Sequence, residues 1–211
     1  MDSMKYRLVA FDLDGTLLVG KSSWWKLHEH FGTIEPSLQN MKDYEERKIA
    51  YDEWMRRDIA LWKPTPHIST IRKILLDYTL ASNAERVIEA LKEKKLQVAI
   101  VTTCLDVLAS PVALRLGVPN VVANGLVLDK NGYLTSKVIF NVDLFDKQKA
   151  FRRLTKKLRI LLSQSIAMGD SKYDVNFLRS AGMGIAIGKD KDLINAADVT
   201  IADLEELLNF V

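Results

Sequence analysis

The sequence has 211 residues, of which 48% are hydrophobic, and its 30 basic and 27 acidic side chains leave a formal net charge of +3. A chain of this length can bury one sizeable core, with or without a smaller appended module. The balanced charge, without a long block of one sign, gives no indication of a nucleic acid or a membrane surface as a partner.

The N-terminal segment MDSMKYRLVAFDLDG lacks the roughly 7–15 apolar residues of a signal-peptide core. No segment reaches the roughly 18 apolar residues that a membrane-spanning helix needs. The single cysteine, Cys104, excludes an internal disulfide and a zinc site made mainly of cysteines. We therefore expect a soluble protein of the reducing cytoplasm.

Five short apolar runs predict buried strands, because each is followed by polar residues or glycine. They are Leu8 to Phe11, Val98 to Val101, Ile166 to Met168, Ile185 to Ile187 and Val199 to Ile201. A further stretch, from Val121 to Ile139, contains the turn signal DKNG between two β-rich runs and predicts a hairpin.

Apolar residues recur at helical spacing between most of these strands. Ser82 and Glu85 predict a capping box at the start of one helix. A second helix is predicted on the stripe Phe151, Leu154, Leu158, Leu161 and Leu162. Strands that alternate with helices favour an α/β fold with a Rossmann-like, mostly parallel sheet and helices on both faces.

A region without a predicted buried strand, residues 19–80, follows the first strand. It contains all four tryptophans and two helical patterns: Trp24, Leu27, His28 and Phe31, then Tyr51, Trp54, Met55, Ile59 and Trp62. We expect a compact helical insert over residues 19–80, placed within a core domain of residues 1–18 and 81–211. Its aromatic residues should mainly form its own core, and one or two tryptophans should line a substrate pocket.

The stretch AFDLDGTLL places Asp12 and Asp14 at the end of the first predicted strand. In an open parallel sheet, ligands bind beyond the carboxyl ends of the strands. Residues i and i+2 of an extended chain point to the same side, so the two carboxylates repel each other unless a cation relieves them. Mg2+ prefers such oxygen ligands and leaves positions for a phosphate. Taken alone, the motif also fits an ordinary turn.

A second acidic pair follows another strand end. In AMGDSKYDVNFL, Asp170 comes just after a predicted strand, and Asp174 lies four residues further on, one turn along a helix beginning near Ser171. The alternative is a helix N-cap at Asp170 and a solvated Asp174. Because the two acidic pairs occur independently, a shared site is favoured.

Two further features suit a phosphate group. The run AIVTTCL ends in Thr102 and Thr103, whose hydroxyl groups can donate to phosphate oxygens. The stretch DKQKAF supplies Lys147 or Lys149, a cation that would neutralise both the phosphate and the acidic cluster. Strand-end threonines and solvated lysines are common, so these residues gain meaning only from the whole set.

In the order DxDGT, strand-end threonine, lysine and GDxxxD, the motifs span nearly the whole chain, and the sequence resembles the haloacid dehalogenase superfamily of phosphohydrolases. Within it, the insert, the hairpin and the tail NAADVTIADLEELL are most similar to phosphoserine phosphatases. The helical insert looks like the small cap that the family places over its active site. The resemblance implies an enzyme, a Mg2+-dependent hydrolase of a small phosphorylated metabolite.

By this similarity, Asp12 would be the nucleophile that forms an aspartyl-phosphate, and Asp14 would act as general acid and then general base. The substrate phosphate would be bound by Thr102, Thr103 and Lys147. The Mg2+ ion would be held by Asp12, Asp14, Asp170 and Asp174. In this set Asp14 would contribute its backbone carbonyl, and Asp174 would be either a ligand or a support.

Departures from the phosphoserine phosphatase pattern leave the substrate open. Thr103 and Cys104 replace the usual Gly-Gly, and Tyr173 replaces an Asn. The glutamate that meets the serine ammonium has no counterpart in VGKSSWW, while Arg56 or Arg57 is a candidate for the arginine that meets the serine carboxylate. A sugar phosphate, a nucleotide and phosphoglycolate are therefore alternative substrates.

Other functions are compatible with parts of the pattern. A phosphomutase or phosphotransferase would pass the aspartyl-phosphate to an acceptor other than water. A dehalogenase needs no second acid, so Asp14 disfavours it. A signalling receiver domain also clusters aspartates, a threonine and a lysine, but it has no comparable insert. A degenerate binding protein on the same fold would lack one of the motifs.

Overall fold

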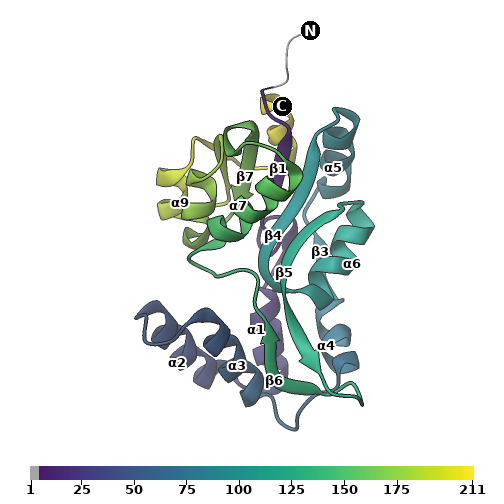
Figure 1. Cartoon of the computed structure of the whole chain (residues 1–211), viewed down its shortest axis with the longest axis vertical. Helices are drawn as coiled ribbons and strands as arrows, with labels where there is room; N and C mark the ends of the chain where they lie inside the picture. Colours follow the sequence, from purple (N-terminus) through teal and green to yellow (C-terminus); the bar gives the residue numbers. More distant parts are fainter. Residues whose placement is uncertain (1–4) are drawn as a thin grey trace.

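A seven-stranded sheet forms the centre of the protein in the computed structural model, which describes residues 5–211 (Figure 1). Its strand order is β6-β5-β4-β1-β7-β8-β9. The strands are β1 (Leu8–Phe11), β4 (Gln97–Leu105), β5 (Asn120–Leu128), β6 (Leu134–Ile139), β7 (Ser165–Gly169), β8 (Met183–Ile187) and β9 (Val199–Ile201). Neighbours are parallel except β5 and β6, which form the predicted hairpin. The prediction of a mostly parallel sheet is confirmed.

Strand β1 lies between β4 and β7 and is buried on both faces. Successive side chains of a strand point to opposite faces. Accordingly, Val9 and Phe11 pack into one hydrophobic cluster, whereas Leu8 and Ala10 pack into the other. This two-sided burial is why the strand is a continuous apolar run in the sequence.

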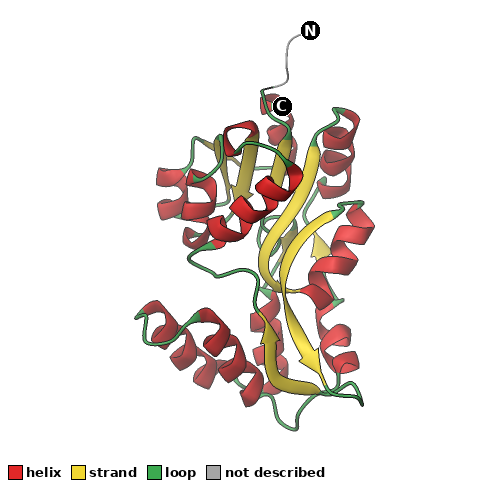
Figure 2. Cartoon of the chain, viewed as in Figure 1, coloured by secondary structure: helices red, strands yellow, loops and turns green. Residues whose placement is uncertain are grey.

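Helices cover both faces of the sheet (Figures 1 and 2). On one face, α5 (Ala84–Glu93), α6 (Asp106–Leu116) and the 3-10 helix η3 (Leu204–Phe210) contribute to the larger cluster. On the other face pack α7 (Lys147–Leu158), α8 (Val175–Arg179) and α9 (Lys191–Ala196). Two further 3-10 turns, η1 (Leu162–Gln164) and η2 (Lys172–Asp174), flank β7 in sequence.

Two helix ends differ from their prediction. Helix α5 begins at Ala84, and the residue before it, Asn83, has a φ of 61°, so the capping box predicted from Ser82 is wrong. Helix α7 ends at Leu158 because Arg159 adopts a left-handed conformation. Leu161 therefore lies beyond the helix and is 66% exposed, instead of on its apolar face.

Four helices lie between the short strands β2 (Leu18–Val19) and β3 (Thr79–Leu80), which pair with each other. They are α1 (Ser23–Phe31), α2 (Ile34–Glu45), α3 (Tyr51–Leu61) and α4 (Ile68–Leu75). Helices α1 and α3 coincide with the two predicted patterns, whereas α2 and α4 were not predicted. In Figure 1 this group lies in the lower half of the molecule, where β6 also lies, and α3 packs against β6.

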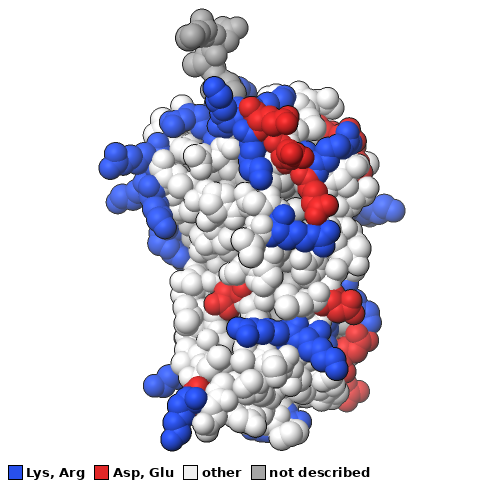
Figure 3. Space-filling model, turned by 90° about the vertical axis from the view of Figure 1, so that its right-hand side faces the viewer, with Lys and Arg blue, Asp and Glu red and all other residues white. Residues whose placement is uncertain are grey.

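The surface of the described residues carries both signs of charge. On the face in Figure 3, basic and acidic side chains occur in small groups separated by wide uncharged areas. Within residues 5–211, none of the helices combines the length and the apolar character that crossing a membrane requires.

Candidate active site

The predicted motifs meet at one edge of the sheet because β4, β1 and β7 are adjacent and parallel. Asp12 directly follows β1, Asp170 directly follows β7, and Thr102 and Thr103 lie near the end of β4. The carboxyl ends of adjacent parallel strands form the usual ligand crevice of an open α/β sheet. The strand topology therefore brings together residues that are more than 150 positions apart in the sequence, such as Asp12 and Asp170.

Lys147, the first residue of α7, reaches into this edge with its ammonium group. Its Nζ atom lies 2.8 Å from Asp12 Oδ1 and 2.5 Å from Asp174 Oδ1. Asp12, Asp170 and Asp174 each offer an oxygen within 4.8 Å of the others. Of the two candidate lysines, Lys149 is instead exposed on the surface, where it pairs with Asp146.

Burial and mutual repulsion set the charges of this cluster. Burial raises the pKa of Asp12 to about 6, although the nearby Lys147 opposes the rise. Burial, followed by the charges of Asp12 and Asp174, raises the pKa of Asp170 to about 8. Burial disfavours a charge on Lys147, but the two carboxylates raise its pKa above the ordinary value. One ammonium group faces three carboxyl groups, which leaves the site electrostatically suited to a further cation.

Asp174 is fully buried and connects Lys147 to the loop that carries Asp170. Its Oδ1 atom accepts from Lys147, and its Oδ2 atom accepts from the backbone N–H groups of Asp170 at 3.2 Å and Ser171 at 3.3 Å. Ser171 and Asp174 form a capping box at η2. Both carboxylate oxygens thus have donors, so this side chain holds its neighbours in position.

Gly15 allows the loop after β1 to approach Asp170 closely. Its φ is +83°, and a Cβ atom at this position would lie 2.1 Å from Asp170 Oδ2. A residue with a side chain would therefore be strained and would displace the Asp170 carboxylate.

Asp14 has partners that its motif did not predict. Its Oδ2 atom accepts from Ser23 N at 2.7 Å, Ser23 Oγ at 2.8 Å and Cys104 Sγ at 3.0 Å. Burial and the charge of Asp14 raise the pKa of Cys104, so its thiol stays protonated and can donate. Among the described residues, these donors all reach Oδ2, which leaves Oδ1 for other partners.

The two threonines of β4 have different surroundings. Thr102 is buried, and its Oγ1 atom accepts from Cys104 N at 3.1 Å. Thr103 lines a cavity, while its carbonyl oxygen accepts from Trp24 Nε1 and Asn124 Nδ2, both at 3.3 Å. Thr102 does not line the cavity, and its bond with Cys104 uses the hydroxyl oxygen only as an acceptor.

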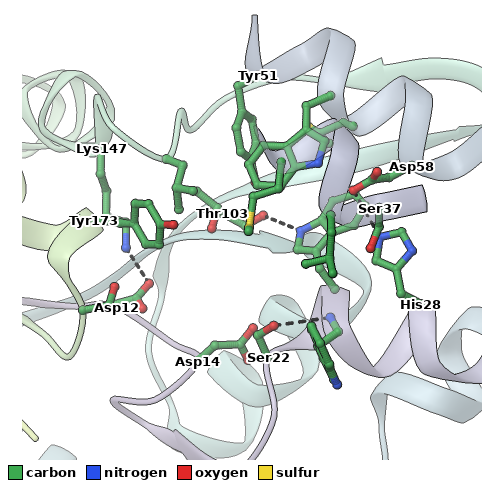
Figure 4. Close-up of a pocket in the computed structure, with 18 of the residues that line it drawn as sticks. Asp12, Asp14, Ser22, His28, Ser37, Tyr51, Asp58, Thr103, Lys147 and Tyr173 are labelled. Atoms are coloured by element: carbon green, nitrogen blue, oxygen red, sulfur yellow. Dashed lines mark hydrogen bonds and ion pairs between the residues drawn. The ribbon is translucent and has the colours of Figure 1, made fainter. Parts of the chain in front are cut away.

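A cavity of about 320 Å³ lies between these strand ends and helices α1, α2 and α3 (Figure 4). Its acidic end is lined by Asp12, Asp14, Thr103, Lys147 and Asp170. Its remaining walls include Trp24, Trp25, Leu38, Met41, Tyr51, Trp54, Met55 and Leu144. Three tryptophans therefore line the cavity, more than predicted, and Trp62 is fully buried in the core beside Phe31.

The end of the cavity away from Asp12 contains His28 and Asp58 (Figure 4). Both are buried, and His28 Nε2 lies 3.1 Å from Asp58 Oδ2. Asp58 Oδ1 also accepts from Asn40 Nδ2 at 2.8 Å. The sequence reasoning did not single out this pair, since its members come from α1 and α3 and have no motif in common.

Neither candidate arginine lines the cavity. Arg56 donates to Asp52 at 2.7 Å and to Glu53 at 3.2 Å, and Arg57 donates to Glu53 at 3.1 Å and to Asp43 at 3.2 Å. Both guanidinium groups are thus engaged by acidic residues of the helical group. Neither arginine is therefore placed to meet the carboxylate of a substrate in the cavity, as one of them was expected to do.

Tyr173 connects the acidic end of the cavity to α2. Its hydroxyl donates to Glu45 Oε1 at 2.8 Å, which lowers the pKa of Glu45, and its ring lines the cavity beside Lys147 (Figure 4). Tyr173, which stands where phosphoserine phosphatases usually have an asparagine, therefore links η2 to helix α2.

Comparisons with known proteins agree with this geometry. A model of the family described as haloacid dehalogenase-like hydrolase matches residues 9–179. The phosphoserine phosphatase of Methanocaldococcus jannaschii is 29% identical over 210 residues, which cover 98% of either chain. A solved phospho-aspartyl intermediate analogue of phosphoserine phosphatase has a TM-score of 0.82 and 27% identity, covering 98% of this chain and 99% of the other. A substrate-bound phosphoserine phosphatase complex has a TM-score of 0.83 and 26% identity, covering 99% and 100%.

Proposed function

The chain belongs to the haloacid dehalogenase-like hydrolase family, and we propose that it is a Mg2+-dependent phosphomonoesterase that forms an aspartyl-phosphate on Asp12. The observation that carries this proposal is the position of Asp12. Its buried carboxylate lies at the end of the central strand, 2.8 Å from the Lys147 ammonium, and lines the cavity. The similar phosphoserine phosphatases, which have about the same length as this chain, support an aspartyl-phosphate mechanism.

In the first step, an Asp12 carboxylate oxygen attacks phosphorus and the bond from phosphorus to the alcohol oxygen breaks. Asp14 gives a proton to that oxygen as it leaves. In the second step, Asp14 takes a proton from water, whose oxygen attacks the phosphorus of the aspartyl-phosphate. Inorganic phosphate leaves, and the Asp12 carboxylate is restored. The free Oδ1 atom of Asp14 suits both proton transfers, because Ser23 and Cys104 hold Oδ2.

Positioning and charge stabilisation account for most of the catalysis in phosphoryl transfer. Lys147 would contact the phosphate and also favour the charged form of Asp12 against its burial. Thr102 and Thr103 would bind phosphate oxygens from the end of β4. The positions of Lys147 and Thr103 in the cavity lining support these roles, and Thr102 lies next to Thr103 in β4 but is buried and outside the lining.

The donor set at this end fits Mg2+. Three carboxyl groups offer hard oxygen ligands within 4.8 Å of one another. Burial is the largest cause of the raised pKa of Asp170, and the charges of Asp12 and Asp174 raise it further. Asp12 and Asp170 would hold the ion with the backbone carbonyl of Asp14, and Asp174 would support them because both its oxygens already have donors. The ion would supply positive charge to the phosphate oxygens.

We further propose that residues 19–80 form a cap domain over a core domain of residues 1–18 and 81–211. Helices α1 to α3 supply most of the cavity walls opposite the strand ends, which supports this division. The substrate would be a small phosphorylated metabolite, and the protein would work in the cytoplasm. A single buried cysteine in its thiol form suits a reducing compartment.

The test is phosphate release from a panel of small phosphomonoesters, with and without Mg2+. We expect Mg2+-dependent turnover by the wild-type protein and loss of turnover in Asp12→Asn, with Asp146→Asn as a matched surface control that keeps activity. Full activity of Asp12→Asn would overturn the proposal.

A further inference from the structure

The part of the cavity that would hold the alcohol portion of a substrate is mainly apolar. Beyond the acidic end, the cavity is lined by Trp24 from α1 and by Tyr51 and Trp54 from α3, together with Met41 and Met55. Figure 4 shows Tyr51 extending from α3 toward Thr103. Aromatic and thioether side chains offer broad apolar contact surfaces, which suit a flat apolar group.

This apolar part offers no lysine or arginine to a substrate carboxylate. Among the described residues that line the cavity, Lys147 is the only lysine or arginine, and it is bound to Asp12 and Asp174 at the acidic end. Arg56 and Arg57 are paired with acidic residues outside the lining. A carboxylate buried here without a partner would pay its desolvation cost in full.

The cavity also offers little to a substrate ammonium group. The acidic residue at the far end, Asp58, accepts from Asn40 Nδ2 at 2.8 Å through one oxygen, and its other oxygen lies 3.1 Å from His28 Nε2 without a hydrogen bond between them. A cationic group would have to compete with Asn40 for one oxygen and share the other with the adjacent His28 ring. An uncharged apolar group needs none of these exchanges and gains from the burial of its surface.

We propose that this cavity selects phosphomonoesters whose alcohol portion is an uncharged aromatic group, in preference to zwitterionic esters such as phosphoserine. The inference rests on the proposed phosphatase function and specifies its substrate class. Trp24, Tyr51 and Trp54 are the residues that determine this specificity, and the pairing of Arg56 and Arg57 outside the cavity removes the recognition of a carboxylate.

The experiment compares kcat/KM for benzyl phosphate, methyl phosphate, O-phosphoserine and phosphocholine in saturating Mg2+. All four are alkyl esters, so their leaving groups are comparable and the alcohol portion is the main variable. Burial of an aromatic ring should favour benzyl phosphate over methyl phosphate about tenfold to a hundredfold. O-phosphoserine should be poorer than benzyl phosphate by at least about tenfold.

Variants test the residues named. Trp54→Ala should reduce the benzyl-to-methyl ratio of kcat/KM about tenfold, and Trp54→Phe, which keeps an aromatic ring, should retain most of it. Arg56→Ala and Arg57→Ala are the matched controls on the same helix and should leave the ratio of benzyl phosphate to phosphoserine unchanged. Thermal unfolding of each variant separates a loss of fold from a change of selectivity.

The outcomes distinguish this inference from the proposed function. If all four esters are hydrolysed but phosphoserine or phosphocholine is preferred, the selectivity is overturned and the phosphatase stands. A specific loss of phosphoserine turnover in Arg56→Ala or Arg57→Ala would likewise overturn it. If no ester is hydrolysed with Mg2+, the phosphatase function and the selectivity fail together.

Discussion

Removal of the Lys147 ammonium group should leave two buried carboxylates without their cation. The Lys147 side chain is 3% exposed, and its partners Asp12 and Asp174 are 10% and 0% exposed. Breaking a buried ion pair by removing one partner costs about 3–5 kcal/mol, because the remaining charge stays buried. We therefore expect Lys147→Met, which retains most of the side-chain volume, to lower the free energy of unfolding by about that amount near neutral pH.

The pH dependence identifies the cause of this loss. Protonation of a carboxyl group removes the unpaired charge, and the pKa of Asp12 is already raised by burial to about 6 with Lys147 present. Without Lys147 it should rise further, so the deficit should grow as the pH rises above about 6 and should shrink as the pH falls toward that value.

Urea denaturation of the metal-free protein at neutral and mildly acidic pH measures this deficit. Lys149→Met is the matched control, because Lys149 is 66% exposed, and its removal should change stability by no more than about 0.5 kcal/mol. A deficit below about 1 kcal/mol for Lys147→Met, or one independent of pH, would refute the reasoning.

Three other perturbations have defined outcomes. Gly15→Ala should abolish most activity, because the new Cβ atom would lie 2.1 Å from Asp170 Oδ2. Gly20 also has a positive φ, but its Cβ atom would have nothing within 4 Å, so Gly20→Ala should keep activity. Equal activities of the two variants would contradict this prediction. Ser23→Ala should lower kcat about tenfold by loosening Asp14, with Ser180→Ala as an unaffected control; an unchanged kcat would argue against Ser23 as a positioning residue. The pKa of Asp170 is raised to about 8, so the protonated group stabilises the metal-free fold at low pH. This contribution is lost as the pH rises toward 8, and the increase in Tm on adding Mg2+ should grow over the same range. An increase in Tm that is independent of pH would contradict this reasoning.

The sequence could predict the acidic end of the site because its parts are tied to strand ends. Asp12 and Asp170 each follow a short apolar run, and the topology rule for open parallel sheets places such residues in one crevice. The prediction needed no side-chain detail, since adjacency of β1 and β7 is enough to bring them together.

The rest of the site depends on contacts that leave no local pattern. Asp14 meets Ser23 and Cys104, whose approach is fixed only when α1 packs over the end of β4. Helix α2 was missed because few of its residues are apolar, and its buried positions are Ser37 and Tyr44. Such contacts follow from tertiary packing, which periodicity does not encode.

One signal for the arginines was present in the sequence. Asp52 and Glu53 precede Arg56 and Arg57 at helical spacing, which favours ion pairs along one helix. That spacing predicts that the two guanidinium groups are engaged locally, as the structure finds, and it weighs against their use for a substrate carboxylate.

The central claim is the covalent role of Asp12, and chemical trapping tests it most directly. Borohydride reduces an aspartyl-phosphate to homoserine, so the wild-type protein would be treated during turnover of a phosphomonoester with Mg2+ and its peptides analysed by mass spectrometry. The account predicts homoserine at position 12, only in the presence of substrate. Homoserine at position 14 or 170 would contradict the account. It would also be contradicted by an unmodified Asp12 in an enzyme that turns over its substrate and accumulates labelled phosphate elsewhere on the protein.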